Sequence, residues 1–156
     1  MQPTINYLFK KKNTIKDEEI RAALKVLKSG DLSGFMGSAG KQFLGGKFVR
    51  KFEKTVEKFY RVKYAISVNS WTSGLIAAVG SLDVEPGDEI IVTPWTMCAT
   101  ATAILHWNCI PVFADINNDT FCIDPLEIKK KITSKTKAII AVDIFGYPAD
   151  INGIKK

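Results

Sequence analysis

The chain has 156 residues, of which 46% are hydrophobic and 24% are charged, a length and composition typical of one folded domain with a hydrophobic core. This composition excludes an intrinsically disordered chain, and the three cysteines are too few and too irregularly spaced for a disulfide framework or a CxxC metal site. The net charge of +6 comes from dispersed basic residues without interleaved aromatic residues, so we expect no nucleic-acid partner.

The first part of the chain predicts two amphipathic helices joined by a glycine-rich loop. Apolar residues at helical spacing predict a first helix from about residue 14 to residue 29, which Gly30 ends. The following residues, up to Gly46, contain too many glycines for a helix or a strand and predict a long loop. Apolar residues from Val49 to Phe59 lie on one face of a second predicted helix, which ends near Tyr60, and we expect that face in the core.

From residue 64 onward, strand-like and helical segments alternate. Runs of β-branched and apolar residues predict four strands, at Tyr64–Val68, Glu89–Thr93, Ile110–Ala114 and Lys137–Val142. Helical spacing predicts helices at 72–82 and 96–107, Asp124 with Pro125 is a typical start of another, and Asp150 could cap one more. This alternation predicts an α/β fold with a mostly parallel sheet flanked by helices.

The turn from the first predicted strand into the next helix carries small hydroxyl residues, among them Thr72 and Ser73. A helix start presents free backbone N–H groups and the positive end of its dipole, and hydroxyls add donors, so this turn could bind a phosphate. On the residues alone, ordinary helix capping is the commoner reason for such a turn. The chain lacks GxxxxGK[ST] and GxGxxG, so a bound phosphate would belong to a cofactor smaller than a nucleotide.

Trp95 and Met97 follow the second predicted strand. Ligands of open α/β sheets gather at the carboxyl ends of strands, so these side chains could cover a planar ring there. The alternative is that both side chains fill the core beneath the next helix. Without the hydroxyl-rich turn, this alternative would be the preferred interpretation.

Six motifs occur in order along nearly the whole chain. They are Gly46–Glu53, Asn69–Leu75, Glu85–Ile91, Pro94–Thr96, Ile110–Ile116 and Val142–Asp150. Together they resemble the DegT/DnrJ/EryC1/StrS family of pyridoxal-phosphate-dependent sugar aminotransferases, a branch of the aspartate-aminotransferase fold (fold type I). Because the match is collinear, it is more specific than any one of the motifs.

The resemblance implies a fold type I domain that is incomplete. Residues 1–47 would form an N-terminal helix and glycine-rich loop, and residues 48–156 the first part of the large domain that binds pyridoxal phosphate. Of the four predicted strands, only the second and third would be neighbours, since strands that come later would separate the fourth from both the first and the second. We therefore expect unpaired strand edges, and a chain that alone is marginally stable, aggregation-prone or completed by another chain.

The resemblance also assigns site residues. The backbone N–H groups and hydroxyls of Thr72 and Ser73 would bind the phosphate of pyridoxal phosphate. The ring would be covered by Met97, where the family usually has an aromatic residue, or by Trp95. We expect no catalytic residue within the chain, because the family's Schiff-base lysine would lie beyond Lys156, as would the carboxylate that binds the pyridine nitrogen, and no metal site.

The function implied by the resemblance is that of an N-terminal fragment of an aminotransferase that transfers an amino group to a keto sugar, nucleotide-linked, from glutamate or glutamine. The full-length enzyme would be a homodimer. One alternative is a dehydratase of the same family, which keeps the cofactor but replaces the lysine. Another is a truncated, non-catalytic remnant that is completed by a partner chain.

The sequence also predicts where the protein acts. No segment approaches the roughly 18 consecutive apolar residues of a membrane-spanning helix. The start, Met1-Gln2-Pro3-Thr4, lacks the charged lead and apolar run of a signal peptide. We therefore expect a cytoplasmic protein with no membrane partner.

Overall fold

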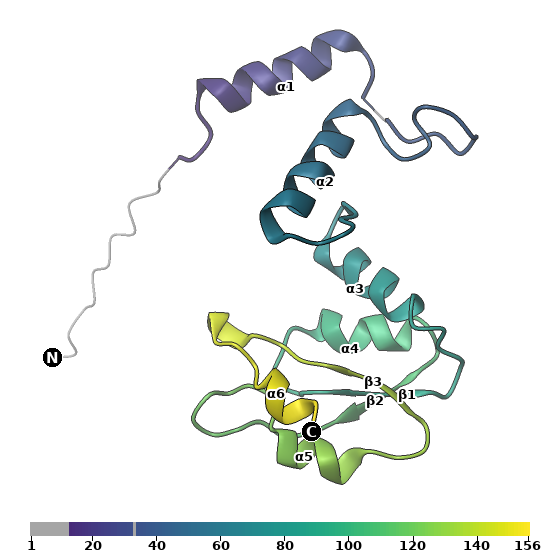
Figure 1. Cartoon of the computed structure of the whole chain (residues 1–156), viewed down its shortest axis with the longest axis vertical. Coiled ribbons are helices and arrows are strands. Elements are labelled where there is room, and N and C mark those ends of the chain that lie inside the picture. The colour runs from purple at the N-terminus through teal and green to yellow at the C-terminus, as the bar shows by residue number, and fades with distance from the viewer. Residues whose placement is uncertain (1–12, 33) are drawn as a thin grey trace, which may run out of the picture. The chain divides into compact units, whose positions relative to one another are not determined.

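The computed structural model describes residues 13–32 and 34–156 (Figure 1). The chain forms two compact units, Met1–Ser67 and Val68–Lys156. The first unit contains the helices α1 (Asp17–Ser29) and α2 (Lys47–Tyr60), and the second contains all the strands. The predicted domains, residues 1–47 and 48–156, are a different division of the chain from these two units. That domain division stays a prediction.

Both predicted helices of the first unit are present. Helix α1 begins at Asp17 rather than near residue 14, because the Glu19 side chain accepts a hydrogen bond of 2.7 Å from the Lys16 backbone N–H and so caps the helix there. Gly30 ends it with a left-handed φ of 69°, as predicted. Helix α2 has no buried residue, and Phe59 is 77% exposed, so the expectation that its apolar face lies in the core is wrong for the described part of the chain.

A parallel sheet of three strands organises the second unit. Its strands are β1 (Glu89–Val92), β2 (Ile110–Phe113) and β3 (Thr136–Ile140), in the spatial order β2-β1-β3. The central strand β1 places Ile91 opposite Val112 on one side and Ile139 on the other. Its residues from Ile90 to Val92 have no exposed surface, which explains the continuous apolar run that predicted this strand.

Helices cover both faces of this sheet (Figure 1). Alternate residues of a strand point to opposite faces. Ile90 and Val92 pack in one cluster with residues of α3 (Trp71–Gly80) and α4 (Cys98–Leu105). Ile91 packs in a second cluster, against α5 (Pro125–Lys131) and α6 (Ile151–Ile154). The prediction of an α/β fold with a parallel sheet between helices is therefore confirmed.

The ends of the two C-terminal helices follow the sequence signals. The Asp124 side chain accepts a 2.8 Å hydrogen bond from the Leu126 backbone N–H at the start of α5, as an N-cap does. Asp150 does the same for α6, accepting from the Gly153 N–H at 2.9 Å. The cap prediction for Asp124 is confirmed, and so is the possibility raised for Asp150.

Two predictions about strands are wrong. The segment Tyr64–Val68 is irregular in the structure, since it has no neighbouring strand among the described residues to pair its backbone N–H and C=O groups. The fourth predicted strand, β3, lies directly beside β1, with no strand between them. β-branched composition favours a strand, but only a partner with matching hydrogen-bonding groups completes it, and pairing order is not encoded in periodicity.

Trp107 joins α3 to the end of α4. Its indole N–H donates a 2.8 Å hydrogen bond to the Ile76 carbonyl oxygen in the middle of α3. The ring lies against Gly80, where an added Cβ atom would overlap the indole Cζ2. The absence of a side chain at Gly80 therefore allows the indole to reach its hydrogen-bond acceptor.

Among the helices of residues 13–32 and 34–156, none combines the length and the apolar character that a membrane span requires.

We expect Gly80→Ala to destabilise the second unit by about 1–3 kcal/mol, since the added methyl group overlaps the Trp107 ring. Gly74→Ala is the matched control in the same helix, because a Cβ there finds only ordinary contacts, the nearest at 3.4 Å from Val68 Cγ2. Alanine should stabilise α3 at this position. Urea denaturation of both variants measures the difference, and equal free energies of unfolding would contradict the Trp107 packing.

The cysteines should differ in reactivity. Cys98 is exposed, whereas Cys109 and Cys122 are buried. Burial raises the pKa of the Cys109 thiol above its ordinary value, and the nearby Asp88 carboxylate raises it further, so less reactive thiolate is present at a given pH. In the native chain at pH 8, iodoacetamide should label Cys98 first. Peptide mapping after denaturation should then find Cys109 unlabelled, and early labelling of Cys109 would contradict its burial.

Candidate functional site

The hydroxyl-rich turn identified in the sequence begins α3. Ser70 is the N-cap, and its Oγ accepts a 3.2 Å hydrogen bond from the Ser73 backbone N–H. The Ser70 and Ser73 hydroxyl oxygens also lie 3.1 Å apart, within hydrogen-bond distance. Helix capping, the commoner explanation on the residues alone, is therefore present in the structure.

Capping leaves other donors of this helix start available. A first helical turn has N–H groups without intrahelical acceptors. The Gly74 N–H donates to the Ser70 carbonyl oxygen at 3.1 Å, but no hydrogen bond within the described residues uses the N–H of Trp71 or Thr72. Thr72 is also exposed. The start of α3 can thus satisfy its own cap and still offer the N–H and hydroxyl of Thr72 to an anion.

A cavity of about 380 Å³ lies at the carboxyl ends of two strands. One part of its lining follows β1 and consists of Thr96, Met97, Ala99 and Thr100. Another part begins at the end of β3 and consists of residues 140–143. Trp71 and Leu75 of α3 complete the lining. The strands are parallel, so their carboxyl ends meet at one edge of the sheet, which is where ligands of open α/β sheets bind. The volume lies in the range of small-molecule sites.

The four site residues predicted from the sequence differ in whether they line this cavity. Met97 lines the cavity, at the N-cap position of α4. Thr72 and Ser73 are not in its lining, but they directly follow Trp71, which is. Trp95 is also outside the lining, and its ring lies 6.3 Å from that of Phe121, at an angle of 32°.

Of the lining residues, sequence reasoning assigned only Met97, and Trp71 and Asp143 are among those that it missed. Trp71 is 76% exposed and is the first residue of α3. Asp143 follows β3, and its carboxylate accepts a 2.9 Å hydrogen bond from the Ala149 backbone N–H, which orders the loop after the strand. Their position at a helix start and a strand end was a signal, but the sequence does not show which side chains line a cavity.

The lining has the mixed character expected of a cofactor site. Most of its residues are apolar, and the polar ones are two threonines and the carboxylate of Asp143. Thr96 and Thr100 are paired through their hydroxyls at 3.0 Å. Among the residues that the structure describes, none that lines the cavity is a lysine or a histidine. A small ligand with a planar ring and a phosphate suits these features, since the cavity is largely apolar and free donors lie at the adjoining helix start.

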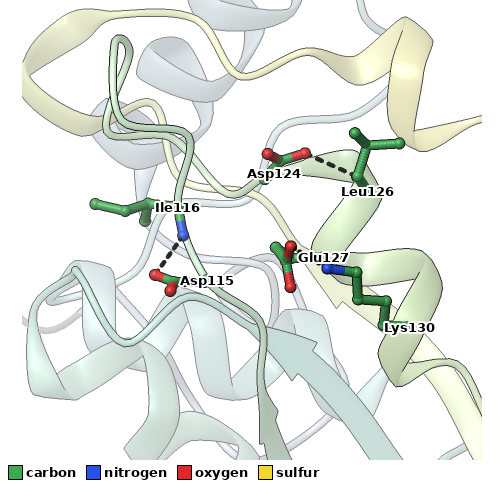
Figure 2. Close-up of polar contacts among 6 residues, drawn as sticks. All are labelled: Asp115, Ile116, Asp124, Leu126, Glu127 and Lys130. Atoms are coloured by element: carbon green, nitrogen blue, oxygen red, sulfur yellow. Dashed lines mark hydrogen bonds and ion pairs between the residues drawn. The ribbon is translucent and has the colours of Figure 1, made fainter.

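A second hollow, of about 460 Å³, is lined by acidic residues, among them Asp115, Asp124 and Glu127 (Figure 2). Asp115 accepts from the Ile116 backbone N–H at 2.8 Å, and Asp124 caps α5. Glu127 pairs with Lys130 at 2.5 Å. In the residues described, no group of three or more histidine, cysteine, aspartate or glutamate side chains could hold a metal ion. Asp115, Asp124 and Glu127 therefore serve local backbone and helix stability.

Comparison with known proteins gives similar sequences across most of the chain. The profile of the DegT/DnrJ/EryC1/StrS aminotransferase family matches residues 14–156. The spore coat polysaccharide biosynthesis protein SpsC of Bacillus subtilis is 37% identical over 137 residues, which are 88% of this chain and 32% of SpsC. The GDP-perosamine synthase of Vibrio cholerae is 36% identical over 110 residues, 70% of this chain and 30% of that enzyme. The chain thus spans about a third of the length of these relatives.

Solved structures share the fold. An aminotransferase from Psychrobacter cryohalolentis superposes with a TM-score of 0.80 at 32% identity, covering 91% of this chain and 34% of that structure. A GDP-4-keto-6-deoxymannose-3-dehydratase, solved with a trapped PLP-glutamate geminal diamine, superposes with a TM-score of 0.78 at 27% identity, covering 92% and 36%. Family profile, sequence identity and fold agree, and the chain belongs to the DegT/DnrJ/EryC1/StrS aminotransferase family.

Proposed function

We propose that this chain is the N-terminal part of a pyridoxal-phosphate-dependent aminotransferase that transfers an amino group from glutamate or glutamine to a nucleotide-linked keto sugar. The observation that carries the proposal is the largely apolar cavity at the carboxyl ends of β1 and β3, next to the free donors of α3. The relatives support the substrate class, since one is named for a GDP-linked amino sugar and another for a GDP-linked keto sugar.

Thr72 would hold the phosphate of pyridoxal phosphate with its backbone N–H and its hydroxyl. Ser73 contributes less in this proposal, because Ser70 already accepts its N–H and contacts its hydroxyl. The positive end of the α3 dipole adds to the attraction for the phosphate. The bound cofactor would supply an electron sink that lets an amino group be exchanged.

Met97 would contact the cofactor ring. Its thioether is polarizable and packs well against an aromatic face, and its side chain is 73% exposed at the cavity. Trp95 is the weaker candidate, since its ring lies beside Phe121. Both assignments extend the expectation drawn from the sequence, and the cavity lining favours Met97.

The chain's own residues would bind and orient the cofactor and exclude water from one side of it. We assign the movement of the proton between the amino-bearing carbons to a lysine outside this set, since none of the described residues that line the cavity is a lysine. We place that lysine in the sequence that follows Lys156. The homodimer and the cytoplasmic location of the full-length enzyme also belong to this proposal. The homodimer rests on the family resemblance, and the cytoplasmic location rests on the sequence signals for a membrane span and a signal peptide that were considered above.

A dehydratase is the second candidate. The observation that favours it is the similarity to a dehydratase of a GDP-linked keto sugar, whose fold matches as well as those of the aminotransferases. In the alternative of a non-catalytic remnant, the same cavity would be completed by a partner chain. The residue at the lysine position distinguishes aminotransferase from dehydratase.

Thr72→Val should weaken binding of pyridoxamine 5′-phosphate by about ten- to a hundredfold, because a hydrogen bond to a charged group contributes about 1.5–3 kcal/mol. Valine has the shape of threonine without its hydroxyl, and Thr72→Ser is the matched control that restores it. Isothermal titration calorimetry of the purified chain measures the affinities. Unchanged affinity in Thr72→Val, or no binding by the unsubstituted chain, would contradict the phosphate assignment.

The coding DNA after the Lys156 codon tests the proposed enzyme. We expect an aspartate-bearing strand, followed by a Ser-x-x-Lys-like segment, in the same reading frame. A residue other than lysine at the last position would favour the dehydratase. An in-frame stop codon with neither segment downstream would contradict the enzyme and favour the non-catalytic remnant.

A further inference from the structure

We propose that Trp71 is a specificity-determining residue of the cavity, whose indole forms an aromatic wall for the planar ring of a phosphate-bearing ligand. The inference rests on the proposed function and deepens it. In this role, Trp71 would distinguish phosphates that carry an aromatic ring from phosphates that do not.

The three tryptophans of the chain differ in their contacts with the protein and in their exposure to solvent. Trp107 donates its indole N–H to the Ile76 carbonyl oxygen and is 39% exposed. Trp95 lies beside the ring of Phe121 and is 50% exposed. Trp71 is 76% exposed, and of the three it alone lines the cavity. Its face is therefore available to a ligand, whereas the other two rings are engaged by the protein.

The position of Trp71 on α3 links its ring to the phosphate donors. Trp71 is the first residue of the helix and directly precedes Thr72. Its indole runs along the first turn, since a Cβ atom at Gly74 would lie 3.5 Å from the indole Cε3. In pyridoxal phosphate, a single CH₂–O link joins the phosphate to the pyridine ring. A phosphate at the Thr72 N–H therefore keeps the ring within reach of the neighbouring indole.

Met97 lines the same cavity from α4. A planar ring in this cavity then contacts an indole from the start of one helix and a thioether from the start of the next. Aromatic faces attract one another in offset or edge-to-face arrangements, beyond the gain from burying apolar surface. A ligand without a ring, such as inorganic phosphate, gains nothing from either side chain. The pair therefore favours aromatic phosphates over other anions.

The test compares two ligands in the full 156-residue chain. Pyridoxamine 5′-phosphate carries the ring and the phosphate, and it lacks the aldehyde that would react with surface lysines. Inorganic phosphate reports on the helix start alone. Trp71→Leu keeps an apolar side chain but removes the aromatic face, and it should weaken binding of pyridoxamine 5′-phosphate about tenfold. The affinity for inorganic phosphate should not change.

Two variants control for indirect effects. Trp71→Phe restores an aromatic face and should recover most of the affinity for pyridoxamine 5′-phosphate. Phe113→Leu removes an exposed aromatic residue of the same unit that does not line the cavity, and it should leave both affinities unchanged. Far-UV circular dichroism verifies folding, which we expect to be kept because the Trp71 side chain is mostly exposed.

The outcomes separate this inference from the proposed function. If Trp71→Leu weakens binding of both ligands equally, or of neither, Trp71 forms no aromatic wall, while the cofactor site itself stands. If the unsubstituted chain binds neither ligand, the proposed function fails and the inference fails with it. Selective loss of pyridoxamine 5′-phosphate binding, with recovery in Trp71→Phe, is the result that supports the inference.

Discussion

Burial of β1 on both faces is the constraint on which the second unit depends. Ile90 and Val92 hold α3 and α4 on one face, and Ile91 holds α5 on the other. A strand with one exposed face could not organise three layers, because each helix must bury its apolar side against something. The same strand ends at the cavity, so the packing that stabilises the fold also sets where Thr96 and Met97 lie.

The start of α3 shows how one short turn can serve both structure and binding. Ser70 satisfies the Ser73 N–H, which stabilises the helix in the absence of any ligand. Thr72, one position earlier than Ser73, keeps its donor. Capping and anion binding, which compete as explanations of the sequence, are compatible in the structure because they use different N–H groups. A helix start with one capping side chain still has several donors left over.

Much of the second unit was predictable because its signals are local. Three predictions depend only on neighbours in sequence, and the structure confirms them. They are the strand around Ile91, the helix cap at Asp124 and the alternation of strands and helices. The prediction of a strand at residues 64–68 was wrong, because a strand also needs a pairing partner that lies far along the chain. The adjacency of β1 and β3 depends on pairing order, and the role of Trp71 in the lining depends on three-dimensional proximity. Hydrophobic periodicity predicts neither the pairing order of strands nor the residues that line a cavity.

The contact between Trp107 and α3 bears on the thermodynamics of binding at the other end of that helix. The indole holds Ile76 by a hydrogen bond and packs on Gly80, so the C-terminal half of α3 is fixed to the rest of the unit before any ligand arrives. Groups that are ordered in advance lose less conformational entropy when they bind. The free N–H donors at the start of α3 thus belong to a helix whose orientation is set before a ligand binds. Less of the interaction energy with an anion is then spent on ordering the helix, and the affinity is higher.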